Sequence, residues 1–139
     1  MVQAIGRPEK QDEALVRSDE VLRLIDQEVV GALATRISRD VECGPYRRFA
    51  LYLRLDSTGT DTHVVQVIVE FLDPQSMKWH QYNQGPFAAL YYEDLDTATE
   101  KDDCYEGFCV GRRMRVRLVG TNTSASLYFT VSVAVEFFN

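Results

Sequence analysis

The sequence predicts an all-β fold, an antiparallel β-sandwich of jelly-roll type preceded by an extended N-terminal arm. Apolar residues alternate with polar ones in several segments after residue 34, which is typical of half-buried strands. Turn residues (Gly, Pro, Asn, Asp and Ser) separate these segments. The 139 residues, 45% of them hydrophobic, fit one globular domain. We therefore expect an arm over residues 1–18 and a single sandwich over 19–139.

The N-terminal third contains the one ambiguous segment. Residues 1–18 are polar and charged, as expected of an arm rather than of a core. In residues 19–33 the apolar positions fit a helical stripe that Ser18 would cap, but they also fit alternating faces of a strand. Because this segment is short and leads into Gly31, a strand is favoured.

The middle of the chain alternates with period two. The predicted strands cover residues 34–41, 47–56, 65–71 and 77–82, and a short segment follows at 87–92. Their breaks are Gly44-Pro45, Ser57–Thr60, Asp73–Ser76 and Gly85-Pro86. The last two predicted strands run from Arg112 to Val119 and from about Ala125 to Phe138. Seven or eight such strands favour an antiparallel sandwich or jelly roll.

Charge and cysteine usage limit the function classes. Fifteen basic against 21 acidic residues give a net charge of −6, which argues against nucleic-acid binding and against binding to an anionic membrane surface. We expect no signal peptide and no membrane-spanning segment, because the apolar runs are only a few residues long. The sequence has three cysteines, Cys43, Cys104 and Cys109. This number is small and odd, which argues against a disulfide framework. We therefore expect free thiols in a protein made in a cytoplasm.

Residues 93–106 form a predicted acidic loop. Its seven acidic residues, among them Asp96, Asp102 and Asp103, stand against one lysine and account for the whole net charge of the chain. Three interpretations are open: a solvated loop between strands, a protein-contact site, or a calcium site, since hard cations bind clustered carboxylates. The spacing does not match an EF-hand.

The segment G-R-R-M-R-V-R-L carries the opposite charge. Period two places Arg113, Arg115 and Arg117 on one face of a strand and Met114, Val116 and Leu118 on the other. The arginines are expected either to pair with acidic neighbours in the same sheet or to contact acidic residues of another subunit, since arginine suits bidentate carboxylate pairing.

Catalytic signatures are missing from the sequence. It has no G-x-S-x-G, no phosphate-binding glycine loop and no H-E-x-x-H, so we expect a non-enzymatic protein without cofactor or metal. The aromatic residues of 79–92 have two interpretations. Trp79 and Phe87 fill the core while the tyrosines line its rim, or exposed rings stack on sugars, as in a carbohydrate-binding module.

The chain resembles small β-sandwich structural proteins of tailed-bacteriophage virions. The resemblance covers about residues 30–138 and lies in the alternating strand 47–56, the D-P-x-x-x-x-W hairpin at 73–79, Gln84–Phe87, Gly107 and the arginine strand 111–117. The same jelly-roll pattern is shared with discoidin-type binding modules.

The resemblance implies a capsid decoration (cement) protein, made in the host cytoplasm and located in the virion. It implies contacts with a major capsid protein or other virion proteins, and a homo-oligomer, with a trimer as one candidate. By analogy, the arm would anchor on the shell through apolar residues such as Leu15 and Val16. The alternatives are a tail or neck component, or a discoidin-like carbohydrate-binding module. The predicted contact residues are Leu15, Val16, Asp96, Asp102, Asp103 and the three arginines.

Overall fold

The computed structural model describes residues 21–31, 33–57, 63–94, 100–121 and 128–139. The predicted arm, with Leu15 and Val16, and the loop residue Asp96 lie outside the described residues. Within these ranges the chain is all-β, as predicted, with ten strands, one short 3-10 helix, η1 (Gly85–Ala89), and no α-helix. No helix of the described part is long and apolar enough to cross a membrane.

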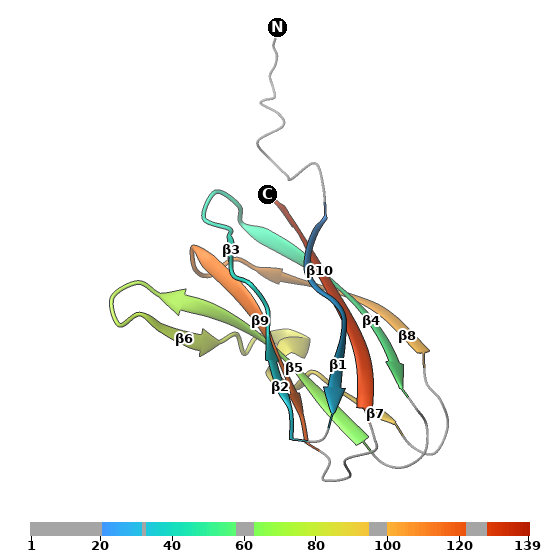
Figure 1. Cartoon of the computed structure of the whole chain (residues 1–139). Helices are drawn as coiled ribbons and strands as arrows, with labels where there is room; N and C mark the ends of the chain where they lie inside the picture. The colour runs from blue at the N-terminus through green and yellow to red at the C-terminus, as the bar shows by residue number, and fades with distance from the viewer. Residues whose placement is uncertain (1–20, 32, 58–62, 95–99, 122–127) are drawn as a thin grey trace, which may run out of the picture.

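Two antiparallel sheets face each other (Figure 1). The four-stranded sheet contains, in spatial order, β1 (Leu22–Gly31), β10 (Tyr128–Phe138), β4 (Arg48–Ser57) and β8 (Glu100–Phe108). The centre of the six-stranded sheet is the pair β9 (Arg113–Gly120) and β5 (His63–Asp73). Its outer strands are β2 (Thr35–Ile37) and β3 (Val41–Glu42) beside β9, and β6 (Lys78–Gln81) and β7 (Tyr91–Asp94) beside β5.

The strand order is that of a jelly roll. β2 and β3 occupy one edge of β9 in succession, and β6 and β7 do the same on β5, so each pair acts as one interrupted strand. If each pair is counted as one strand, the chain has eight strands, which can be renumbered 1 to 8 from the N-terminus. In these new numbers the two four-stranded sheets have the strand orders 1-8-3-6 and 2-7-4-5. Double-sheet jelly rolls have this arrangement. The predicted β-sandwich is therefore confirmed.

The core lies between the sheets and follows the predicted alternation. The inward residues of β4, β5, β9 and β10 are nearly all fully buried; among them are Leu51, Leu55, Val67, Val116 and Val133. At one end of the sandwich, Phe49 packs against Phe71, Tyr82 and Phe87 with ring centroids 5.4–6.2 Å apart. Rings at such distances and tilts stabilise a core beyond their buried area.

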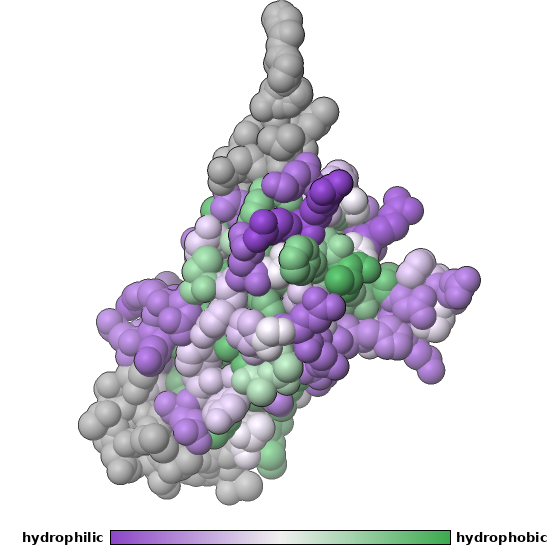
Figure 2. Space-filling view, turned by 180° about the vertical axis from the view of Figure 1, so that it is seen from behind, coloured by the Kyte–Doolittle hydropathy of each residue, from purple (hydrophilic) through white to green (hydrophobic). Residues whose placement is uncertain are grey.

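The outside of the molecule carries no large continuous apolar surface on the face drawn in Figure 2. Hydrophobic side chains there lie as small patches between hydrophilic ones, which occupy the projecting edges (Figure 2). Exposed apolar residues such as Leu33, Met77 and Val110 come from separate segments of the chain. Scattered apolar residues of this kind are normal for a protein surface.

β1 shows why residues 19–33 were ambiguous. Within this segment Leu22–Gly31 is a strand, as favoured, but its pairing with β10 shifts register between Arg23 and Ile25 and again between Ile25 and Glu28. Gln27 has a φ of 49°, and the consecutive residues Leu24 and Ile25 are both buried. These β-bulges break the period of two and leave an apolar spacing that resembles a helical stripe.

The predicted acidic loop 93–106 is wrong in its main part. Residues 100–108 form β8, which pairs in continuous register with β4 from Asp56–Glu100 to Arg48–Phe108. The acidic residues of this segment obscure the alternation of inward and outward side chains that is typical of a strand. Asp103, Tyr105 and Gly107 are opposite the core-facing residues of β4, and Glu100, Asp102, Cys104 and Glu106 alternate with them on the outer face.

Two glycines allow close approach between elements. A Cβ at Gly120, at the end of β9, would lie 2.0 Å from the carbonyl oxygen of Gly31 at the end of β1. A Cβ at Gly107 would lie 2.6 Å from the Phe49 ring. Any side chain at either position would force the backbone or the aromatic cluster to move.

Candidate protein-contact site

The arginine strand has the two faces that the sequence predicts. Along β9 the burial alternates strictly, so that Met114, Val116 and Leu118 are fully buried while the three arginines lie on the outer face of the six-stranded sheet. Like charges at this spacing repel each other unless acidic groups lie between them.

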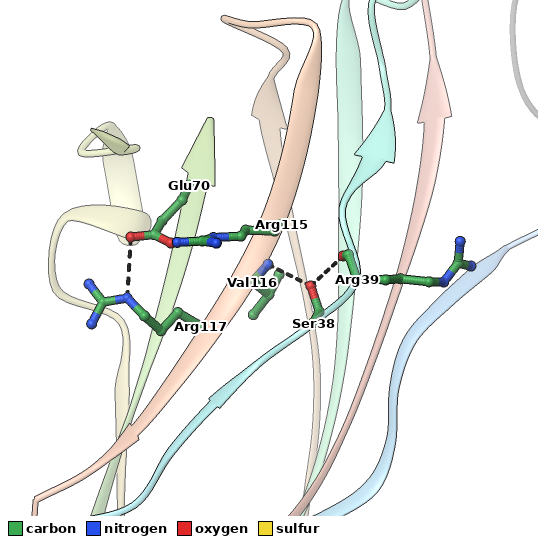
Figure 3. Close-up of polar contacts among 6 residues, drawn as sticks. All are labelled: Ser38, Arg39, Glu70, Arg115, Val116 and Arg117. Carbon is green, nitrogen blue, oxygen red and sulfur yellow. Dashed lines mark hydrogen bonds and ion pairs between the residues drawn. The ribbon is translucent and has the colours of Figure 1, made fainter. Parts of the chain in front are cut away.

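Glu70 of β5 supplies that acidic group for two of the arginines (Figure 3). Its side chain is only 6% exposed; one carboxylate oxygen accepts from Nε of Arg115 at 2.8 Å and the other from Nε of Arg117 at 3.2 Å. Cross-strand pairing places Glu70 between Arg115 on one side and Gln81 on the other, which buries the carboxylate. Glu70, Arg115 and Arg117 are called the Glu70 cluster below.

Arg113 pairs separately. It donates from Nε to Asp40 at 2.6 Å and from Nη1 to Glu42 at 3.1 Å. The hydrogen bond from Arg113 lowers the pKa of the Asp40 carboxyl below its ordinary value. The three arginines therefore have three acidic partners in their own sheet or in the connection between β2 and β3, which corresponds to the first of the two expected arrangements.

Ser38 joins the two halves of the interrupted edge strand next to these residues (Figure 3). Its hydroxyl donates to the carbonyl oxygen of Arg39 at 2.7 Å and accepts from the backbone N–H of Val116 at 2.9 Å. Its own N–H donates to the carbonyl of Val116 at 2.9 Å. The buried hydroxyl thus keeps β9 hydrogen-bonded between β2 and β3.

Trp79 does not fill the core, so that part of the aromatic prediction is wrong, whereas Phe87 is buried as expected. Trp79 pairs with Leu72 on the outer side of the six-stranded sheet, and the guanidinium carbon of Arg115 lies 4.3 Å from its ring centroid. This cation–π contact orients Arg115 and covers the ring that a sugar would need for stacking.

On the outer face of the four-stranded sheet, several carboxylates share one arginine, the reverse of the Glu70 cluster. Arg54 of β4 lies 2.7 Å from Asp102, 3.4 Å from Glu100 and 3.5 Å from Asp56. The three carboxylates raise the pKa of the Arg54 guanidinium. These four residues are called the Arg54 cluster. Asp102, predicted as a contact residue, belongs to it.

Asp103 points to the other side of β8 and has a different partner. The hydroxyl of Tyr92 in β7 donates to its carboxylate at 2.7 Å and lies 3.3 Å from the hydroxyl of Tyr105. Burial, followed by these two hydrogen-bond partners, raises the pKa of Tyr92. Because β7 and β8 belong to different sheets, this contact connects the two sheets along one edge.

A shallow groove crosses the outer face of the four-stranded sheet. Two adjoining hollows of about 480 Å³ each share Tyr52 and Cys104. Short side chains, Ala50, Ala134 and Ser132, form its floor beside the Tyr52 ring, and the Tyr52 hydroxyl bonds to Glu136 at 3.1 Å. This volume is in the range of small-ligand sites. No pattern in the sequence indicates this groove, because it depends on which residues are neighbours across four strands.

The cysteines are free, and they differ in accessibility. Cys43 is buried, Cys109 is half-buried and Cys104 is exposed. Although Cys104 is exposed, partial desolvation by its neighbours, followed by the nearby Glu106 and Glu136 carboxylates, raises the pKa of its thiol. Among the described residues there is no group of three or more His, Cys, Asp or Glu side chains able to hold a metal ion.

The predicted contact residues therefore separate into distinct places. Arg113, Arg115 and Arg117 lie on the outer face of one sheet, Asp102 lies on the outer face of the other, and Asp103 lies between the sheets. Within one chain the arginines and Asp102 do not meet. Sequence reasoning missed Glu70 and Arg54, which determine the charge balance of the two faces.

Comparison with known proteins shows similarity in structure only. No family model matches the sequence, and no curated protein matches it significantly. The chain is similar to a chain in the crystal structure of the T13 particle of infectious bursal disease virus (IBDV), with a TM-score of 0.57 and 10% identity over 88% of its own length. A chain in the structure of the Gx strain of this virus gives a TM-score of 0.48 at 9% identity over 99% of the length, too low to carry an argument.

The chain spans about a third of the viral chains that it resembles, 31% of the first and 38% of the second. At 10% identity, the similarity to the first shows a shared fold. The jelly roll derived above from the strand order is thus a fold that also occurs in an icosahedral virus particle.

Proposed function

We propose that this protein is a non-enzymatic structural component of a virus particle, and most specifically a capsid decoration protein that stabilises the head through contacts between subunits. The observation that carries the proposal is the shared jelly roll, which covers 88% of this chain and occurs in a chain of an icosahedral particle. A structural protein needs a rigid sandwich and complementary surfaces, and it needs no catalytic residues.

The outer surfaces support this proposal. Both sheets carry clusters of arginine and carboxylate side chains on their outer faces, and arginine–carboxylate pairs are suited to specific contacts between proteins. The partners would be the major capsid protein, other virion proteins and further copies of the same chain, with a trimer as one arrangement. The protein would be made in the host cytoplasm and located in the virion.

Quantitative mass spectrometry of particles purified from the natural host would test the proposal. A decoration protein is expected in a copy number comparable to that of the shell protein and should remain on particles after gradient purification. A copy number of a few per particle would place it in the tail or neck instead. Its absence from purified particles would overturn the proposal.

The groove around Tyr52 favours one second candidate, a carbohydrate-binding module. Its half-exposed tyrosine ring and short neighbours fit sugar stacking better than Trp79, which Arg115 covers. A glycan array with the wild-type chain and the Tyr52→Ala variant tests it. Binding that the variant loses would support this candidate, and an array without binding would remove it.

A further inference from the structure

We propose that the Glu70 cluster of one copy binds the Arg54 cluster of a second copy, so that copies associate head to tail through opposite faces of the sandwich. This inference deepens the proposed function, because it names a surface through which subunits of the particle would contact each other. Four observations carry it: the excess charge of each cluster, its spare hydrogen-bonding groups, its spacing and its position.

The two clusters have opposite excess charges. In the Glu70 cluster, one carboxylate accepts from two guanidinium groups, which leaves an excess of one positive charge. In the Arg54 cluster, three carboxylates share one guanidinium group, which leaves an excess of two negative charges. Arginine does not lose its proton in proteins, so the positive excess is permanent.

Each cluster also has hydrogen-bonding groups to spare. Arg115 and Arg117 donate to Glu70 through Nε, and their terminal nitrogens have no partner among the described residues. Figure 3 shows that the terminal nitrogens of Arg117 point away from Glu70. In the Arg54 cluster, the Glu100 and Asp102 side chains are 72% and 68% exposed. Two terminal nitrogens of one guanidinium can bind both oxygens of such a carboxylate.

The spacing of the groups matches. Arg115 and Arg117 are two residues apart on β9, and Glu100 and Asp102 are two residues apart on β8. Residues at this separation on one face of a strand repeat at about 6.6–6.8 Å. Two arginine–carboxylate pairs can therefore form side by side when the strands of two copies are aligned.

The positions of the clusters determine the symmetry. Because the clusters lie on the outer faces of different sheets, one copy cannot join its own two clusters. A contact between different surfaces of identical chains is heterologous, and repeated copies form a closed ring or a filament. The ring would be the form suited to a closed shell.

Sedimentation velocity of the full chain at about 50 mM and about 500 mM salt tests the inference, since screening weakens contacts between exposed charges. We expect salt-sensitive association of the wild type. The variant Arg117→Gln and the double variant Glu100→Gln/Asp102→Asn should each weaken association about 5-fold or more. Far-UV circular dichroism checks that each variant is folded.

Two matched controls share the strands of the tested residues. Arg113→Gln removes an arginine of the same face of β9 that already has two acidic partners, and Glu106→Gln removes a β8 carboxylate that pairs one to one with Arg48. Both should leave association unchanged. A mixture of Arg117→Gln with the acidic double variant has one intact contact and should stop at a dimer.

A wild type that stays monomeric at low salt, or association that the cluster variants and the controls weaken equally, would overturn the inference. These results are independent of the proposed function, which depends on the presence of the chain in particles. A chain found in particles whose Arg117→Gln variant is incorporated as well as the wild type would overturn the inference and leave the proposed function standing.

Discussion

The Glu70 cluster and the Arg54 cluster, on the outer faces of the two sheets, use the same residue types in opposite proportions. On the six-stranded sheet, the buried carboxylate of Glu70 holds two arginines, and a tryptophan ring lies under one of them. On the four-stranded sheet, the exposed guanidinium of Arg54 is shared by three carboxylates. Because Glu70 is buried and Arg54 is exposed, we expect the Glu70 cluster to stabilise the fold more, although the Arg54 cluster has more ion pairs.

The largest effect is expected from Glu70→Gln. Removing a buried charge leaves two guanidinium groups with their mutual repulsion, which should lower the free energy of unfolding by about 2 kcal/mol. Urea denaturation measures this loss. Arg54→Gln is the matched change on the other face; because Arg54 is well exposed, its effect should be clearly smaller. Equal losses in the two variants would show that burial does not distinguish the faces.

A smaller effect is expected where the two sheets meet. Tyr92→Phe removes the hydroxyl that bonds to Asp103 at 2.7 Å and should cost about 1 kcal/mol in urea denaturation. Tyr105→Phe is a useful comparison, since the hydroxyl of Tyr105 contacts that of Tyr92 and not the carboxylate in the described contacts.

Tyr92 also makes the stability of the fold depend on pH. The pKa of Tyr92 is raised in the folded state, so its contribution to stability is fully present below the ordinary tyrosine pKa of about 10 and is lost as the pH rises further. The difference in unfolding free energy between wild type and Tyr92→Phe should therefore be constant from neutral pH to about pH 9 and shrink above about pH 10. A difference that grows in alkali would contradict the assignment.

The smallest predicted effect concerns the rate at which a thiol is modified and not the stability of the fold. Cys104 is the exposed thiol, so N-ethylmaleimide should modify it before Cys109 and Cys43, as peptide mass spectrometry would show. Because its pKa is raised by partial desolvation and by the Glu106 and Glu136 carboxylates, its reaction should be slower than that of a free cysteine. Glu106→Gln should accelerate the modification of Cys104. An unchanged rate would show that the Glu106 carboxylate does not raise the pKa of this thiol.

Most of the fold was predictable because burial leaves a period of two in the sequence. The inward residues of β4, β5, β9 and β10 followed that pattern and were assigned correctly. The prediction failed where local composition outweighed the pattern. β8 contains four acidic residues in nine, which predicts a loop, although its alternate residues pair with the core-facing positions of β4. Bulges hid the same pattern in β1.

The candidate site was predictable in part. The sequence identified the arginine face of β9 and the acidic character of residues 100–106, since both are properties of single segments. It did not identify Glu70 or Arg54 as the centres of the two clusters, because each partner comes from a strand that is distant in sequence. The residue type of Trp79 fits both a core and an exposed position, and its register opposite Leu72 puts it on the outer face.

The all-β class, most of the core residues and the total charge can be read from the sequence, because these depend on residue type and on alternation within one strand. Which charges meet depends on the way the strands assemble into sheets. Strand order separated the arginines and the acidic strand onto outer faces of different sheets, and cross-strand register buried Glu70 while leaving Arg54 exposed. The Glu70 cluster and the Arg54 cluster therefore have opposite local excess charges, a property that follows from pairing between strands and not from any segment of the chain.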